Sequence, residues 1–109
     1  MAKKKKALAL TINKKLVEFE YVEQFEMMQK IVDAARLHHR VLIRYQKNGD
    51  TKEPQQRSVA PYSYKPEYAD AGGIVYAEQG GRIKSFALNQ ITEITVTQDL
   101  FTPQWPVEL

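Results

Sequence analysis

The spacing of apolar residues changes from a helical period to a strand period near residue 40. From about Glu23 to Arg40, apolar side chains recur every three or four positions, which predicts one amphipathic helix with a buried stripe. The members of this stripe are Phe25, Met28, Ile31 or Val32, and Ala35. Acidic residues gather where this helix begins and basic residues where it ends, as the helix dipole favours.

Beyond Arg40 every second residue is apolar in five successive segments, which is the period of β-strands. Turn residues separate the segments, among them Asn48-Gly49-Asp50 and Gly80-Gly81, which accept positive φ. The predicted strands cover residues 41–47, 55–64, 73–79, 82–88 and 92–98. Residues 16–22 fit both periods, and we favour a strand there.

Five short antiparallel strands leave two exposed edges, and closure into a small barrel removes both of them. We therefore predict a mainly β domain, a small five-stranded antiparallel barrel with the N-terminal helix packed on it. Pro103 and Pro106 interrupt the strand pattern of the last ten residues. We expect this segment to lie back over the barrel, with contact to a partner protein as the alternative.

The net charge of +3 comes from a lysine run, Lys3 to Lys6, and not from the rest of the chain. A lysine run repels itself and buries nothing, so we predict a flexible basic tail over residues 1–10 and one domain over residues 11–109. A solvated tail is favoured over a nucleic-acid-binding arm. Within the domain, basic residues exceed acidic ones between residues 36 and 57, which makes an anionic partner worth testing.

Composition and motifs argue against catalysis. The chain has no cysteine, and its two histidines, His38 and His39, are neighbours that point about 100° apart on a helix, so they do not form a metal site together. No nucleophile elbow, phosphate loop or paired-carboxylate motif occurs. We expect no enzyme activity, no metal and no cofactor. No apolar run approaches the length of a membrane span, and we expect a cytoplasmic protein.

Aromatic and basic residues share the predicted strands. Aromatic rings can stack on bases, and nearby cations neutralise phosphates. The residues concerned are Tyr45, Arg57, Tyr62, Tyr64, Tyr76, Arg82 and Lys84. By itself this pattern supports nucleic-acid or nucleotide binding only weakly, because most of these rings also suit a core.

The order of three segments resembles the WYL-domain family from about Ile31 to Phe101. These segments are IVDAARLHHRVLIRY, RSVAPYSY and RIKSFALNQITEITVTQDLF. The resemblance implies a bacterial or phage module with an Sm-like barrel, which acts as a regulatory ligand sensor or as an accessory protein. Some members of the family bind single-stranded DNA or RNA.

The resemblance implies a ligand-facing set of Tyr45, Arg57 and Lys84, to which strand geometry adds Tyr62 and Arg82. The chain departs from the family at three short motifs, Gly73-Ile74-Val75, Lys84-Ser85-Phe86 and Asn89-Gln90-Ile91. The first replaces the tripeptide that names the family, and the other two each lack an arginine, so the anion-binding inference is weakened.

Two functions follow as expectations. The first is a stand-alone, non-catalytic regulatory or accessory module that binds single-stranded nucleic acid or a nucleotide-like anion on the barrel face. The alternative is an interaction subunit that forms a homodimer or docks on a protein partner and binds no ligand. A basic surface that joins Arg44, Arg57, Arg82 and Lys84 would favour the first function, and a large apolar patch would favour the second.

Overall fold

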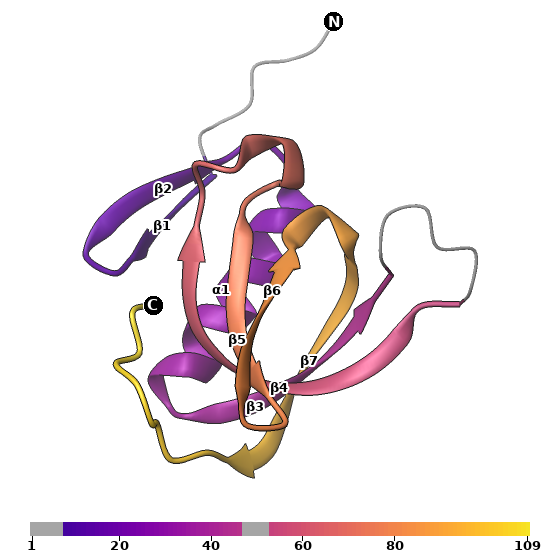
Figure 1. Ribbon diagram of the computed structural model, residues 1–109. Helices are drawn as coiled ribbons and strands as arrows, with labels where there is room; N and C mark the ends of the chain where they lie inside the picture. Colours follow the sequence, from indigo (N-terminus) through magenta and orange to yellow (C-terminus); the bar gives the residue numbers. More distant parts are fainter. Residues whose placement is uncertain (1–7, 47–52) are drawn as a thin grey trace, which may run out of the picture.

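The computed structural model describes residues 8–46 and 53–109, which form two antiparallel sheets and one α-helix (Figure 1). The smaller sheet is a hairpin of β1 (Leu8–Ile12) and β2 (Lys15–Phe19), and α1 (Val22–Arg36) follows it. The strands of the larger sheet are β3 (His39–Tyr45), β4 (Gln55–Lys65), β5 (Ile74–Gln79), β6 (Arg82–Ala87) and β7 (Ile91–Leu100). Two short 3-10 turns are η1 (Ala69–Ala71) and η2 (Leu88–Gln90).

Helix α1 confirms the predicted stripe, but it ends at Arg36 and not near Arg40, and His39 and Arg40 belong to β3. Met28, Ile31, Val32 and Ala35 are buried in one core with apolar residues of the larger sheet, and Phe25 packs partly buried against them.

Within the described part of the chain, no helix is long and apolar enough to cross a membrane.

The larger sheet has the strand order β6-β5-β4-β3-β7, and every neighbouring pair in it is antiparallel. Its five strands agree closely with the five predicted segments. The expected turn at Asn48-Gly49-Asp50 lies outside the described residues, but the strands on either side of it pair in register, with Val41 opposite Val59 and Ile43 opposite Arg57.

The prediction of a closed, Sm-like barrel is wrong. Among the described residues, β6 and β7 do not pair with each other, so the larger sheet is open at both edges (Figure 1). Charged and polar side chains along a short edge strand also prevent the sheet edge from pairing with the sheet of another molecule. Strand β6 has six residues and carries Arg82 and Lys84, and most of its side chains are exposed. The fold is mainly β with one helix, as predicted, but its sheets are open.

Strand β2 confirms the strand favoured over residues 16–22, although α1 already begins at Val22, whereas its partner β1 was not predicted. Strand β1 begins at Leu8, inside the range predicted as a tail, whereas residues 1–7 lie outside the described residues. The turn uses Asn13 and Lys14, both in the left-handed region, with φ of 52° and 68°. Ile12 is 3% exposed, and a guanidinium nitrogen of Arg36 donates to the carbonyl oxygen of Thr11 at 2.9 Å, so the hairpin is tied to α1.

The segment after β7, which we expected to lie over a barrel, contacts the open sheet. The amide of Phe101 donates to the carbonyl of His38 at 2.9 Å, and the amide of Glu108 donates to the carbonyl of Tyr62 at 2.7 Å. Glu108 also forms a parallel bridge with Ser63 of β4. This segment therefore runs alongside β4 (Figure 1).

Candidate ligand-binding site

The two faces of the larger sheet have different surroundings. We call the face that packs on α1 the inner face, and it includes the buried residues Val41, Ile43 and Val59. Side chains of directly opposed residues in an antiparallel pair share a face, and successive side chains alternate. Arg57, opposite Ile43, therefore lies on the inner face. The other face is called the outer face.

The predicted residues Tyr45, Arg57 and Lys84 come together on the inner face. The guanidinium carbon of Arg57 lies 5.6 Å from the ring centroid of Tyr45 and 5.8 Å from that of Phe86. The two rings meet edge to face at 5.0 Å. Lys84 is opposite Ala77 in the pairing of β5 with β6 and points to the same face as Phe86, two residues further on.

A neutral side chain connects the two cations. The Oε1 atom of Gln79 accepts from a guanidinium nitrogen of Arg57 at 3.5 Å and from Nζ of Lys84 at 3.4 Å. Both distances are long for hydrogen bonds, so Gln79 holds each cation weakly, and within the described residues each cation keeps donors for another acceptor. Sequence reasoning missed Gln79, although its place directly before Gly80-Gly81, opposite Arg82, follows from the hairpin turn.

Neither Arg57 nor Lys84 forms a salt bridge within residues 8–46 and 53–109. Arg40, on the outer face, shows the contrast. It donates to Glu78 at 3.0 Å and to both the hydroxyl and the carbonyl oxygen of Ser58. The pKa of Glu78 is lowered, first by the amide of Gly81, which donates to its carboxylate at 2.7 Å, and then by Arg40.

Tyr45 supports Arg57 and leaves little surface for a ligand. It is 9% exposed, and its hydroxyl donates to Oε1 of Gln90 at 2.9 Å. The guanidinium of Arg57 lies over the ring and the ring of Phe86 meets it edge to face, so these contacts take up ring surface that a stacked base would need. The ring of Tyr45 thus supports the guanidinium of Arg57.

The remaining predicted residues divide between the faces. Arg82 is exposed and stands opposite Gln79, so it extends the row of cations on the inner face. Tyr62 is 4% exposed, and its ring meets Phe101 and Trp105 of the C-terminal segment, away from Arg57. Arg44 is on the outer face, 3.9 Å from the carboxylate of Glu93. Of the four cations whose joining would favour ligand binding, Arg57, Arg82 and Lys84 share the inner face and Arg44 does not.

Two of the three motifs in which the chain departs from the family it resembles take part in specific contacts. The hydroxyl of Tyr64 donates to the carbonyl of Gly72 at 2.7 Å and lies where a Cβ on Gly73 would be, so no larger residue fits there. Burial raises the pKa of Tyr64 to about 12. Gln90, where the family has arginine, is the acceptor for Tyr45. In the part of the chain that the structure describes, no three His, Asp or Glu side chains are arranged to hold a metal ion.

Comparison with known proteins gives one match. The model of the WYL domain family matches residues 26–96, which runs from the first half of α1 through most of β7. No curated protein and no solved structure matches the chain. The matched range contains the inner-face cations and leaves out the hairpin of β1 and β2 and the segment after β7.

Proposed function

Since the chain belongs to the WYL domain family, we propose that it is a non-catalytic regulatory module that binds single-stranded nucleic acid or a nucleotide-like anion on the inner face of its sheet. Members of this family are often ligand-sensing and are generally regulatory. The proposal goes further than the family by naming a ligand class and a site.

One observation carries the proposal. Arg57 and Lys84 share a neutral acceptor, the amide oxygen of Gln79, and neither is paired with a carboxylate in the described part of the chain. An anion placed here would gain charge-assisted hydrogen bonds from both cations without first displacing a carboxylate of the described residues. Such bonds are about twice as strong as those between neutral groups.

The geometry suits a phosphate-bearing ligand. The planar guanidinium of Arg57 can donate two parallel bonds to phosphate oxygens, and its central carbon lies 5.6 Å from the ring centroid of Tyr45 and 5.8 Å from that of Phe86. Lys84 and Arg82 both lie on β6, two residues apart on the same face. Successive phosphates of a bound nucleic-acid strand could therefore each meet a cation. An exposed, open row of cations favours an extended single strand over a rigid duplex.

A binding titration tests the proposal. Short fluorescein-labelled single-stranded DNA and RNA are titrated with the full chain at several salt concentrations, with a duplex of the same sequence as control, and anisotropy is measured. We expect the single strands to bind more tightly than the duplex, with affinity falling as salt rises by a slope of about −0.7 for each phosphate neutralised. Absence of binding at low salt, or equal binding of the duplex, would contradict the proposal.

A second candidate function rests on exposed leucines at one corner of the molecule. Leu37 and Leu100 are each 68% exposed, and they lie close together because Leu100 pairs with His39, just after Leu37. Exposed apolar side chains at one place are typical of protein contacts. In this alternative the chain docks on a partner or dimerises through this corner. Light scattering during size-exclusion chromatography tests dimerisation, and a monomer at all concentrations would exclude a homodimer.

A further inference from the structure

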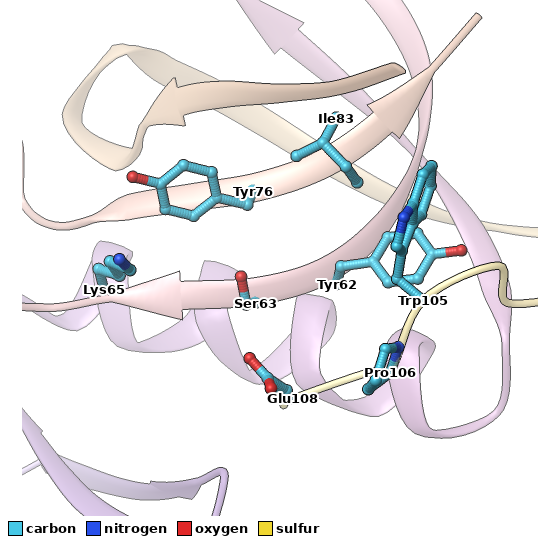
Figure 2. A pocket seen from close by; sticks show the side chains of 8 residues that line it. All are labelled: Tyr62, Ser63, Lys65, Tyr76, Ile83, Trp105, Pro106 and Glu108. Atoms are coloured by element: carbon cyan, nitrogen blue, oxygen red, sulfur yellow. The ribbon is translucent and has the colours of Figure 1, made fainter. Parts of the chain in front are cut away.

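The outer face of the sheet carries a hollow between the strands and the C-terminal segment (Figure 2). Its volume is about 350 Å³, which falls within the range for small-molecule sites. The strands β4, β5 and β6 supply its floor, and the segment after β7 supplies one wall. The lining residues are Tyr62, Ser63, Lys65, Tyr76, Ile83, Trp105, Pro106 and Glu108.

The lining is divided into an apolar end and a polar end. Figure 2 shows Ile83, Trp105 and the ring of Tyr62 together at one end. Ser63 lies toward the other end, with Lys65 on one side of it and the carboxylate of Glu108 on another. A ligand that fills this hollow therefore meets rings at one end and both signs of charge at the other.

The wall formed by the C-terminal segment is fixed by contacts with Tyr62. The hydroxyl of Tyr62 accepts from the amide of Gln104 at 3.0 Å, and its carbonyl accepts from the amide of Glu108 at 2.7 Å. Its ring meets that of Trp105 edge to face at 5.5 Å. Because these contacts hold the wall before any ligand arrives, binding costs little ordering of the chain.

The two charges at the polar end are free to meet a ligand. Lys65 is exposed and lies 5.7 Å from the ring centroid of Tyr76, and Glu108 is also exposed. Across the described residues, neither charge takes part in a salt bridge, with the other or with any third group. A simple anion would leave Glu108 as a repelling neighbour, and a simple cation would meet the same difficulty at Lys65.

We infer that this hollow binds a free α-amino acid with an aromatic side chain. The ligand's carboxylate pairs with the ammonium of Lys65, its ammonium pairs with the carboxylate of Glu108, and its ring lies against Trp105 and Ile83. The hydroxyl of Ser63, which lies between Lys65 and Glu108 (Figure 2), can donate to the ligand's carboxylate. The site is on the opposite face from Arg57 and Lys84, because Tyr76 and Ile83 alternate with Ala77 and Lys84 along β5 and β6. An experiment can therefore exclude one site without excluding the other.

The chain offers its own probe for this site, because Trp105 is its single tryptophan. The emission of Trp105 is followed while L-phenylalanine is added to the full chain, with excitation at a wavelength that phenylalanine does not absorb. We expect a saturable change in emission, and N-acetyl-L-phenylalaninamide, which lacks both charges, should bind at least about tenfold more weakly. An emission that does not change, or equal binding of the uncharged analogue, would overturn the inference.

Variants assign the two charges. Lys65→Met and Glu108→Gln should each weaken L-phenylalanine binding by about tenfold, since each removes one charge-assisted hydrogen bond. Lys84→Met, on the opposite face, is the matched control and should bind L-phenylalanine like the unaltered chain. Unchanged binding by Lys65→Met or Glu108→Gln, or full-strength binding of N-acetyl-L-phenylalanine, which has no ammonium group, would overturn the proposed pairing. Both altered side chains are exposed, so unchanged melting temperatures should confirm that the variants fold.

Discussion

The guanidinium of Arg57 lies over the ring of Tyr45, 5.6 Å from its centroid, across two neighbouring strands of the larger sheet. The contact holds a cation beside the buried apolar residues of the inner face. It also explains why a buried tyrosine stands beside the half-buried Arg57, since the hydroxyl of Tyr45 reaches Gln90 while its ring contacts the guanidinium. Preorganisation of this kind reduces the entropy lost when a ligand binds.

Tyr45 should act on the ligand through its ring and on stability through its hydroxyl. Tyr45→Phe keeps the ring, so we expect nearly unchanged oligonucleotide affinity and a loss of about 1 kcal/mol in the free energy of unfolding. Tyr45→Leu removes the cation–π contact and should weaken binding about two- to fivefold. Anisotropy and urea denaturation measure the two effects. Wild-type affinity in the leucine variant would show that the ring does not position Arg57.

The ion pair of Arg40 with Glu78 predicts a loss of stability in acid. The pKa of Glu78 is lowered in the folded chain below the ordinary value of a glutamate, chiefly by the amide of Gly81. Its contribution to the free energy of unfolding is therefore present above about pH 4.5 and is lost as pH falls through the lower, folded pKa. Glu78→Gln should flatten the fall of melting temperature in this acid range.

Glu93→Gln is the control for Glu78, because Glu93 also stands beside an arginine but is 65% exposed, at 3.9 Å from Arg44. Exposed pairs of this kind contribute little to stability. We expect the melting temperature of Glu93→Gln to fall with decreasing pH in the same way as that of the unaltered chain. If the two variants have the same profile, Glu78 is not a source of the acid sensitivity.

Two glycines separate the effect of space from that of backbone conformation. Gly73 and Gly81 both have positive φ, 93° and 88°, but a Cβ would meet the hydroxyl of Tyr64 only at Gly73, while it would meet nothing at Gly81. We expect Gly73→Ala to lower the melting temperature clearly more than Gly81→Ala, because it must also displace Tyr64 from its bond to Gly72. Equal losses would mean that the strained backbone alone accounts for both.

Truncation from the N-terminus locates the domain boundary. Deletion of residues 1–7 should leave the melting temperature nearly unchanged, because the first strand begins at Leu8. Deletion of residues 1–12 also removes the buried Ile12 and the acceptor of Arg36, and should cost several kcal/mol, of the order found when large core side chains are lost. Thermal denaturation compares the two chains. A large loss on the shorter deletion would place the boundary before residue 8.

The shorter deletion also tests where nucleic acid binds. If the inner face is the site, the chain that begins at Leu8 should keep most of its affinity for single strands. Its salt slope should fall only by the contribution of Lys3 to Lys6. Loss of nearly all binding would place the contact in the lysine run.

Local periodicity was sufficient to predict α1 and the five strands of the larger sheet. It was not sufficient to predict how the sheet ends, because closure depends on hydrogen bonds between β6 and β7, which no alternation of side chains encodes. The β1 strand escaped notice because its apolar residues follow a lysine run, and because the Asn13-Lys14 turn lacks the glycine that usually marks a hairpin.

The candidate site was predicted in part for similar reasons. The family resemblance supplied Tyr45, Arg57 and Lys84, and the structure brings these three together. Tyr62 was placed with them wrongly by strand membership alone, although alternation from Arg57 to Tyr62, five residues on, already puts the two on opposite faces. Gln79 was missed because a neutral amide carries no signal of its own; its role appears only when two strands bring cations to it.

The most direct test of the inner-face site removes its two central cations together. Arg57→Gln with Lys84→Gln is compared with Arg44→Gln with Lys15→Gln, which changes the net charge equally at exposed positions elsewhere. Anisotropy with the labelled single strands should show a loss on the order of 1–3 kcal/mol of binding free energy for the first pair, with nearly unchanged melting temperature, and a much smaller loss for the second. Equal affinity of the two double variants would contradict the inner-face site and favour a protein-interaction subunit.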